Sequence, residues 1–212
     1  MAYAVKEIFY SLQGEGAHVG RPAVFCRFVG CNLWSGYERD RASAICRFCD
    51  TDFVGTDGQG GGIFRDEIHL ADAVFDAWPC DTREIPPYVI FTGGEPTLQL
   101  DANLVSQLKR RGAQVGIETN GTRCLPSGID WICVSPKANT ELAVQSGDEL
   151  KLVFPQDFIH PTEFEKLAFT HFYLQPMDNG DSSSNLRRAV EYCLANPRWR
   201  LSLQTHKLLG LR

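Results

Sequence analysis

Residues 31–34 and 46–51 read Cys31-Asn32-Leu33-Trp34 and Cys46-Arg47-Phe48-Cys49-Asp50-Thr51, a C-x14-C-x2-C pattern of three cysteines. Three thiolates, two of them on one tight turn, can hold three corners of a cubane iron–sulfur cluster. The fourth iron would lack a protein ligand, and an open metal position is a place for chemistry. A zinc knuckle and three unrelated core cysteines remain open as alternatives at this point.

Outward from the cysteines, apolar runs alternate with helical patterns. The run before Cys31, residues 22–29, is almost continuously apolar, which is typical of a strand in a parallel sheet. The alternation predicts an α/β protein with a parallel sheet, and 212 residues predict a single domain over 1–212. We expect strands at 22–29, 88–92, 113–118, 130–134, 149–154, 171–174 and 201–206, and helices at 66–78, 98–111, near 161–168 and from 182–184. The helix at 66–78 would carry Ile68, Ala71, Phe75 and Trp78 on one apolar face.

Polar segments follow four of the predicted strands. They are Thr92-Gly-Gly-Glu-Pro96, Glu118-Thr-Asn-Gly121, Ser135-Pro-Lys137 and Gln175-Pro-Met-Asp178. Sites in parallel α/β folds form at the carboxyl ends of strands, so these segments predict one site along that edge of the sheet. Gly93 and Gly94 would let the backbone approach a ligand closely, and Glu95 could accept hydrogen bonds from an ammonium group.

Composition limits the partners. The net charge is −5, and no basic cluster is long enough to indicate a nucleic-acid-binding face. We expect no membrane span, because no apolar run approaches the required length. The N-terminal residues lack the pattern of a signal peptide, so we expect a cytoplasmic protein whose eight cysteines are reduced thiols.

The cysteines and Gly93-Gly94-Glu95-Pro96 together resemble the radical S-adenosylmethionine (SAM) superfamily. There, three cysteines hold a [4Fe-4S] cluster whose fourth iron chelates SAM. The usual superfamily spacing is C-x3-C-x2-C. Ser35 stands where the second cysteine would fall, and Cys46 takes that role, which we interpret as a loop insertion.

Over nearly the whole chain, the sequence resembles the 7-carboxy-7-deazaguanine synthase family. The most specific matches are Phe9-Tyr-Ser-Leu-Gln-Gly-Glu-Gly16, Phe25 to Trp34, Cys49-Asp-Thr51, the four strand-end segments and Gln204-Thr-His-Lys207. The resemblance implies a shortened, open parallel (β/α) barrel, a homodimer and a requirement for Mg²⁺. It also implies conversion of 6-carboxy-5,6,7,8-tetrahydropterin to 7-carboxy-7-deazaguanine with release of ammonia, on the route to queuosine.

The resemblance also implies roles for particular residues. The cluster ligands would be Cys31, Cys46 and Cys49, and Thr51 would bind Mg²⁺. The SAM-binding residues would be Phe48, Cys49, Asp50, Gly94, Ser135, Pro136, Lys137, Gln175, Pro176, Met177 and Asp178. The pterin would be held by Leu12, Gln13, Gly14, Arg27, Thr92 and, through its α-carboxylate, Arg212. We expect the apolar tail with Leu208, Leu209 and Leu211 to pack back over the mouth of the barrel. Glu118 and His206 either face the substrate or are structural polar groups, and no catalytic acid or base is assigned.

Two other functions remain as alternatives. One is another radical SAM enzyme, such as a glycyl-radical activase, although the chain shows no second cysteine-rich segment. The other is a zinc-stabilised binding module, which would need a fourth cysteine or histidine at short spacing. The enzyme would require a reducing partner such as a flavodoxin.

Overall fold

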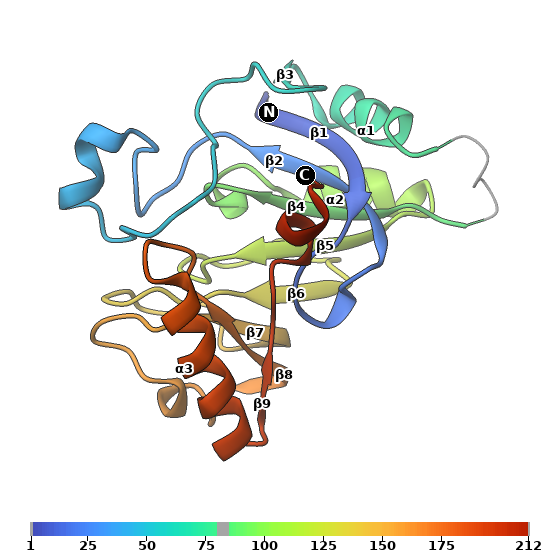
Figure 1. Ribbon diagram of the computed structural model, residues 1–212. Coiled ribbons are helices and arrows are strands. Elements are labelled where there is room, and N and C mark those ends of the chain that lie inside the picture. The colour runs from blue at the N-terminus through green and yellow to red at the C-terminus, as the bar shows by residue number, and fades with distance from the viewer. Residues whose placement is uncertain (1, 80–84, 212) are drawn as a thin grey trace.

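The computed structural model describes residues 2–79 and 85–211. These residues form one nine-stranded sheet in the order β3-β1-β2-β4-β5-β6-β7-β8-β9 (Figure 1). Its strands are β1 (Tyr3–Leu12), β2 (Pro22–Phe28), β3 (Gly62–Phe64), β4 (Tyr88–Gly93), β5 (Gln114–Thr119), β6 (Trp131–Val134), β7 (Ser146–Phe154), β8 (Ala168–Pro176) and β9 (Trp199–Leu201). β1 is antiparallel to β2 and β3, and all other paired neighbours are parallel. Because β3 and β9 end the sheet as unpaired edges, the expected open barrel is confirmed.

Helices fill only some of the strand connections. The α-helices are α1 (Glu67–Asp76), α2 (Ala102–Arg110), α3 (Ser182–Ala195) and α4 (Thr205–Leu209), and the 3-10 turns are η1 (Gly16–His18), η2 (Glu38–Ser43), η4 (Pro96–Leu98) and η5 (Pro161–Glu163). Within the described ranges, none of these helices has the length and apolarity needed to span a bilayer.

Strand alternation separates an apolar outer face from a polar inner face. Successive side chains of a strand point to opposite sides of a sheet. On β7, Leu150 and Leu152 are buried in the core beneath α3, whereas Lys151 and Val153 face a central cavity. The inner face can therefore carry charged groups without disturbing the apolar packing outside.

The helices α1 and α2 pack on the outer face of β1, β2, β4 and β5. The expected apolar stripe of α1 was Ile68, Ala71, Phe75 and Trp78, and this was wrong in part. Leu70, Ala71 and Val74 are fully buried, whereas Ile68 is half exposed. Ala71 is in the buried core and Phe75 and Trp78 pack against it, so Ile68 alone of the four lies off the face that meets the sheet.

Three further expectations need correction. The predicted helix 98–111 is split into η4 and α2, and Asp101 caps α2 by accepting a hydrogen bond from the amide of Leu104. The helix near 161–168 is only the short turn η5. The predicted strand 201–206 was wrong except at its first residue, because β9 ends at Leu201 and Thr205 and His206 are in α4.

The glycine-rich segment 55–62 lies at the surface and is packed along β1. The Ile8 amide donates to the Gln59 carbonyl (2.7 Å), and the Gly58 amide donates to the Lys6 carbonyl (3.0 Å). A Cβ atom at Gly61 would lie 2.2 Å from the Lys6 oxygen, so a side chain there would collide with the backbone of β1. Close packing against β1 therefore explains this glycine.

Candidate functional site

A cavity of about 520 Å³ opens at the carboxyl ends of the parallel strands. It is lined by segments that follow β2, β4, β5, β6, β8 and β9, together with the end of β1. The described residues of the predicted site that line it are Leu12, Gln13, Gly14, Arg27, Cys31, Cys46, Phe48, Cys49, Asp50, Thr51, Thr92, Gly94, Ser135, Lys137, Gln175, Pro176, Met177 and Asp178. Pro136 is not in this lining, and its carbonyl accepts from Gln156 (3.3 Å). Arg212 lies outside the described residues.

Cys31, Cys46 and Cys49 are free thiols on the wall of this cavity. A hydrogen bond from Cys46 lowers the pKa of Cys49 to about 6, and that same bond, together with burial, raises the pKa of Cys46. In the described part of the chain, no three Cys, His, Asp or Glu side chains are gathered closely enough to form a metal-binding group as they stand. Three soft thiol donors on one wall are nevertheless the donor set that an iron–sulfur cluster takes.

The glycines after β4 let two loops approach each other. A Cβ atom at Gly94 would lie 2.2 Å from the carbonyl oxygen of Gly30 and 2.7 Å from the Cβ of Cys31. Any side chain at this position would push the strand end away from the cysteine loop. Gly94 therefore fits a backbone that must approach both the cysteines and a ligand.

Glu95 does not face the cavity, contrary to the role considered for it. The side chain is fully buried, and its two carboxylate oxygens accept from the Thr97 amide (3.0 Å), the Thr97 hydroxyl (2.7 Å), the Thr119 hydroxyl (2.7 Å) and the Asn120 amide (2.8 Å). With four donors already in place, this carboxylate is satisfied. It fastens the turn after β4 to the end of β5.

Lys137 reaches the cavity from the loop after β6. Its ammonium donates to the carbonyl (2.6 Å) and the hydroxyl (2.7 Å) of Ser135 and lies 5.9 Å from the ring centroid of Phe48. Burial lowers the pKa of Lys137, although the thiols of Cys46 and Cys49 oppose that shift. These contacts place the cation of the predicted SAM-binding segment 135–137 next to Phe48 of the cysteine turn.

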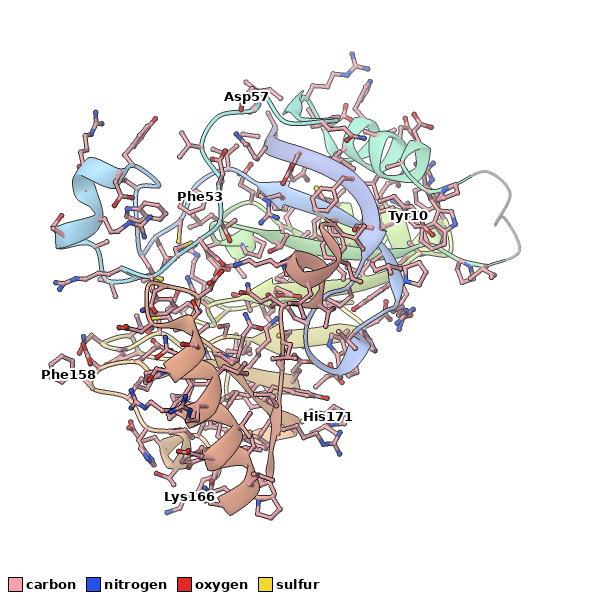
Figure 2. All side chains as sticks on the ribbon, viewed as in Figure 1. Tyr10, Phe53, Asp57, Phe158, Lys166 and His171 are labelled. Atoms are coloured by element: carbon pink, nitrogen blue, oxygen red, sulfur yellow. The ribbon has the colours of Figure 1, made fainter. Side chains whose placement is uncertain are left out.

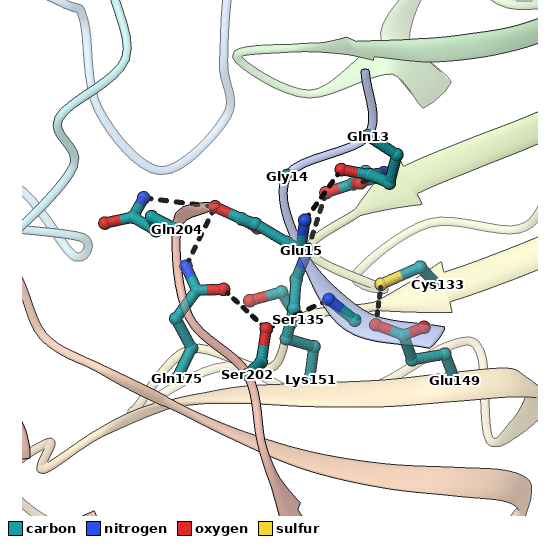
Figure 3. A network of polar contacts seen from close by, with 12 residues as sticks. Gln13, Gly14, Glu15, Cys133, Ser135, Glu149, Lys151, Gln175, Ser202 and Gln204 are labelled. Atoms are coloured by element: carbon teal, nitrogen blue, oxygen red, sulfur yellow. Dashed lines mark hydrogen bonds and ion pairs between the residues drawn. The ribbon is translucent and has the colours of Figure 1, made fainter. Parts of the chain in front are cut away.

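A buried charge network forms the floor of the cavity (Figure 3). Lys151, whose side chain is 4% exposed, pairs with Glu15 (2.5 Å) and Glu118 (3.0 Å). Burial raises the pKa of Glu15, but the ion pair with Lys151 and a hydrogen bond from Gln204 outweigh it and hold that pKa below its usual value. Gln13 donates to the other oxygen of Glu118 (2.7 Å), so the network connects β1, β5 and β7.

Arg27 has the anionic partner that its place on a buried strand required. Its Nε atom donates to Glu7 across the β1–β2 pair (2.8 Å), and both side chains are mostly covered. Because the bond uses Nε, it leaves the outer edge of the guanidinium for other acceptors. Arg27 and Glu7 both line the cavity, so a bound carboxylate could share this arginine.

The C-terminal segment covers the mouth of the cavity. Lys207 donates to Asp50 of the cysteine loop (2.6 Å) and to Asp178 after β8 (2.5 Å). The Thr205 amide donates to the Gly14 carbonyl (2.9 Å), and a Cβ atom at Gly14 would lie 2.1 Å from the His206 ring. The segment therefore folds back over the site as expected.

The apolar side chains of this segment do not cause that closure. Leu208 is 76% exposed, and Leu209 and Leu211 also face outwards. The expectation that these leucines pack onto the barrel was wrong, because polar contacts of Thr205, His206 and Lys207 hold the segment. Phe158, in the loop after β7, likewise points away from the molecule (Figure 2) and adds nothing to the cavity wall.

Sequence reasoning missed Glu15, Lys151, Gln204 and Lys207 as members of the site. Lys151 had a local signal, because it is a charged residue in the apolar run Leu150-Lys151-Leu152-Val153-Phe154. A charge on a buried strand needs a partner, as was noted for Arg27. Gln204 and Lys207 belong to the motif Gln204-Thr-His-Lys207, but nothing in that motif indicates which residues their side chains contact.

The whole chain is similar to curated proteins of one name. It is 60% identical over 218 aligned residues to 7-carboxy-7-deazaguanine synthase from Nitratidesulfovibrio vulgaris, and 58% and 59% identical over 214 residues to those from Bradyrhizobium diazoefficiens and Bordetella pertussis, with 100% of each chain covered. No family model matches. The crystal structure of QueE from Escherichia coli superimposes with a TM-score of 0.66 at 25% identity and covers 96% of this chain and 94% of its own. From the full-length identities, the chain belongs to the 7-carboxy-7-deazaguanine synthase family.

Proposed function

We propose that this chain is a radical SAM enzyme that converts 6-carboxy-5,6,7,8-tetrahydropterin to 7-carboxy-7-deazaguanine with release of ammonia. The observation that carries the proposal is the cavity of about 520 Å³ at the carboxyl ends of the strands. It brings three free cysteines together with the strand-end segments, in a chain of this family. Family membership also counts against a glycyl-radical activase and a zinc-stabilised module.

In this proposal, Cys31, Cys46 and Cys49 hold a [4Fe-4S] cluster. Such a cluster, when reduced, supplies the electron that cleaves the sulfonium of SAM. The protein's own part is to aim the three thiols and to keep them in a half-buried pocket.

The SAM site in this proposal surrounds the cysteine wall. Phe48, Cys49 and Asp50 line it from the cysteine turn, and Gly94 lets the backbone approach. The remaining contacts come from 135–137 and 175–178, where Pro136 would act by holding the loop between Ser135 and Lys137, since Pro136 itself is outside the cavity lining and its carbonyl is bonded to Gln156. Asp50 and Asp178 are already joined through Lys207, so a ligand between them would lie beneath the C-terminal helix.

The pterin site in this proposal is on the charged floor. Arg27 binds the carboxylate of the pterin, because a guanidinium forms forked, charge-assisted bonds with carboxylates. The side chains of Leu12, Gln13 and Thr92 and the backbone of Gly14 surround the ring, and the α-carboxylate of Arg212 accepts from its N–H groups. Glu118 faces the substrate here as a second acceptor, held by Lys151 and Gln13. His206 closes the same space from the C-terminal segment.

Magnesium is part of the proposal through Thr51, which lines the cavity directly after Asp50. Mg²⁺ prefers oxygen ligands and keeps several waters, so one hydroxyl and the substrate carboxylate are suitable partners. Thr51→Ala should weaken stimulation by Mg²⁺ and leave SAM binding near normal. An unchanged Mg²⁺ dependence would assign Thr51 a structural role.

The proposal also includes a homodimer, a reducing partner such as a flavodoxin, and a cytoplasmic location that suits free thiols. It treats residues 1–212 as a single radical SAM core domain, supported by the one continuous sheet. Sedimentation of the purified protein tests the dimer.

An anaerobic assay tests the reaction itself. The protein is reconstituted with iron and sulfide, reduced, and mixed with SAM, Mg²⁺ and the carboxy-tetrahydropterin. Appearance of the deazapurine chromophore with release of ammonia supports the proposal. A protein that holds a cluster and cleaves SAM but leaves the pterin intact would indicate another radical SAM substrate. A colourless protein that purifies with zinc would indicate the binding module.

A further inference from the structure

The insertion at residues 35–45 projects from the body of the molecule (Figure 1) and contains η2. Arg41 of η2 reaches back to the cysteine turn. Its Nη1 atom donates to the carbonyl oxygen of Arg47 (2.9 Å) and to that of Cys49 (3.1 Å). One guanidinium therefore spans the turn that carries Cys46 and Cys49.

Arg41 is itself held in place on its other sides. Its Nε atom donates to both carboxylate oxygens of Glu38 (2.9 and 2.7 Å), and its guanidinium lies 4.1 Å from the ring centroid of Trp34. Trp34 is buried, donates from Nε1 to the Tyr37 carbonyl (3.2 Å) and meets Phe53 edge-on at 5.6 Å. The Arg41 side chain is only 27% exposed, so it is ordered by an ion pair and an aromatic face before it contacts the turn.

The chemistry of arginine suits this role. A guanidinium is always charged and carries five N–H donors in a fixed fork, and its hydrogen bonds are stronger than neutral ones. A carbonyl held by such a donor cannot rotate freely, which restricts the backbone dihedrals on either side of it. In this turn, those dihedrals determine where the thiols of Cys46 and Cys49 point.

We propose that Arg41 is a positioning residue that braces the Cys46–Cys49 turn for cluster binding, so the insertion does more than lengthen the spacing between cysteines. This inference rests on the proposed function, because it assumes that the turn holds a cluster. Arg41 acts through the backbone carbonyls and does not touch the thiols. Ser35, at the position of the missing cysteine, supports the same insertion by donating to Asp40 (2.7 Å).

Three variants of the full-length protein test the inference. Arg41→Gln removes the charge and the fork, and Arg41→Lys keeps the charge without the fork. Arg39→Gln is the matched control, because Arg39 lies two residues earlier in η2, is 76% exposed and pairs with Asp40 at 3.7 Å. The first measurement is the rate at which the reconstituted, anaerobic protein releases iron to a chelator. The second is amide hydrogen exchange of residues 46–50 in the protein before reconstitution.

We expect Arg41→Gln to release iron about tenfold faster than the unchanged protein, as loss of one to two charge-assisted bonds implies. Its amides at 46–50 should exchange faster by a similar factor. Arg41→Lys should release iron and exchange these amides at rates between those of Arg41→Gln and the unchanged protein. Arg39→Gln should match the unchanged protein in both measurements.

Each contrary result has a distinct meaning. If Arg41→Gln matches Arg39→Gln in iron release and in exchange, the brace is wrong and the proposed function stands. If the unchanged protein binds no iron under reconstitution, the proposed cluster fails and this inference fails with it. If circular dichroism shows that Arg41→Gln is unfolded, Arg41→Lys still tests the inference. Iron release and amide exchange equal to those of the unchanged protein in Arg41→Lys would show that the guanidinium fork does not brace the turn.

Discussion

At the scale of single residues, Lys151 carries the charge balance of the cavity floor. Lys151→Met would leave Glu15 and Glu118 as buried carboxylates without a cation. Removing one partner of a buried ion pair costs on the order of 3–5 kcal/mol of stability. Chemical unfolding at pH 7.5 should show this loss, whereas Lys166→Met, on the exposed lower edge of the molecule (Figure 2), should be nearly neutral.

The effect of Lys151→Met on stability should depend on pH. With Lys151 present, the pKa of Glu15 is lowered, so its contribution to stability is present above the pKa of the unfolded chain and is lost as pH falls through the folded pKa. Without Lys151, burial alone would raise the pKa of Glu15, so protonation at low pH would relieve the penalty. The stability difference between the two proteins should therefore be smaller at pH 5 than at pH 7.5. An equal difference at both pH values would mean that Lys151 does not serve to offset the charge of Glu15.

The cysteines give a second prediction at this scale. Cys31→Ala, Cys46→Ala and Cys49→Ala should each lose bound iron and all activity. Cys26→Ala removes a fully buried thiol of the outer core and should keep the cluster at a cost of about 1–2 kcal/mol. Iron content and unfolding midpoints separate the two outcomes. A full cluster in Cys46→Ala together with loss of iron in Cys26→Ala would overturn the ligand assignment.

At the scale of elements, the central parallel strands were predictable, whereas the antiparallel strands β1 and β3 and the buried faces of the helices were not. The strands between 88 and 134 follow apolar runs, and each differs from its predicted range by one residue at most at either end. In α1, by contrast, the predicted stripe included the half-exposed Ile68 and missed the fully buried Leu70 and Val74. The face that meets the core is wider than one stripe, because Phe75 and Trp78 also pack there, and helical periodicity alone does not fix that width.

The cap of α2 supplies a prediction at this scale. Asp101 accepts from the Leu104 amide (3.0 Å) and from the fully buried Tyr3 hydroxyl of β1 (2.9 and 3.0 Å). Asp101→Ala should cost about 2–4 kcal/mol, because it removes a helix cap and leaves a buried hydroxyl without an acceptor. Asp101→Asn keeps one acceptor and should cost less.

A double variant tests how these two effects combine. If the hydroxyl and the carboxylate depend on each other, Asp101→Ala with Tyr3→Phe should cost less than the sum of the single changes. Urea unfolding of the four proteins gives the interaction free energy. Strict additivity would show that the hydroxyl finds another partner.

At the scale of the whole molecule, the position of the site was predictable from strand ends, but the polar contacts that join its walls and close it were not. Glu15 and Lys151 are 136 residues apart in the chain, and their ion pair joins the segment after β1 to β7. No local pattern identifies such a pair, since only the completed curvature of the sheet brings β1 and β7 into contact with one cavity. The contact of Lys207 with Asp50 is equally remote, at 157 residues.

The closure leads to the last prediction, which concerns the C-terminus. β9 ends at Leu201, so deletion of 203–212 should leave the sheet intact and remove Gln204, His206 and Lys207 from the cavity wall. SAM and pterin should then bind at least about tenfold more weakly, since several charge-assisted contacts are lost. A C-terminal tag should raise the Michaelis constant for the pterin while an N-terminal tag does not. Leu208→Ala, which changes an outward-facing side chain of the same helix, is the control and should bind both ligands normally. Unchanged affinities in the deletion variant, at matched iron content and circular dichroism, would show that α4 merely rests on the barrel.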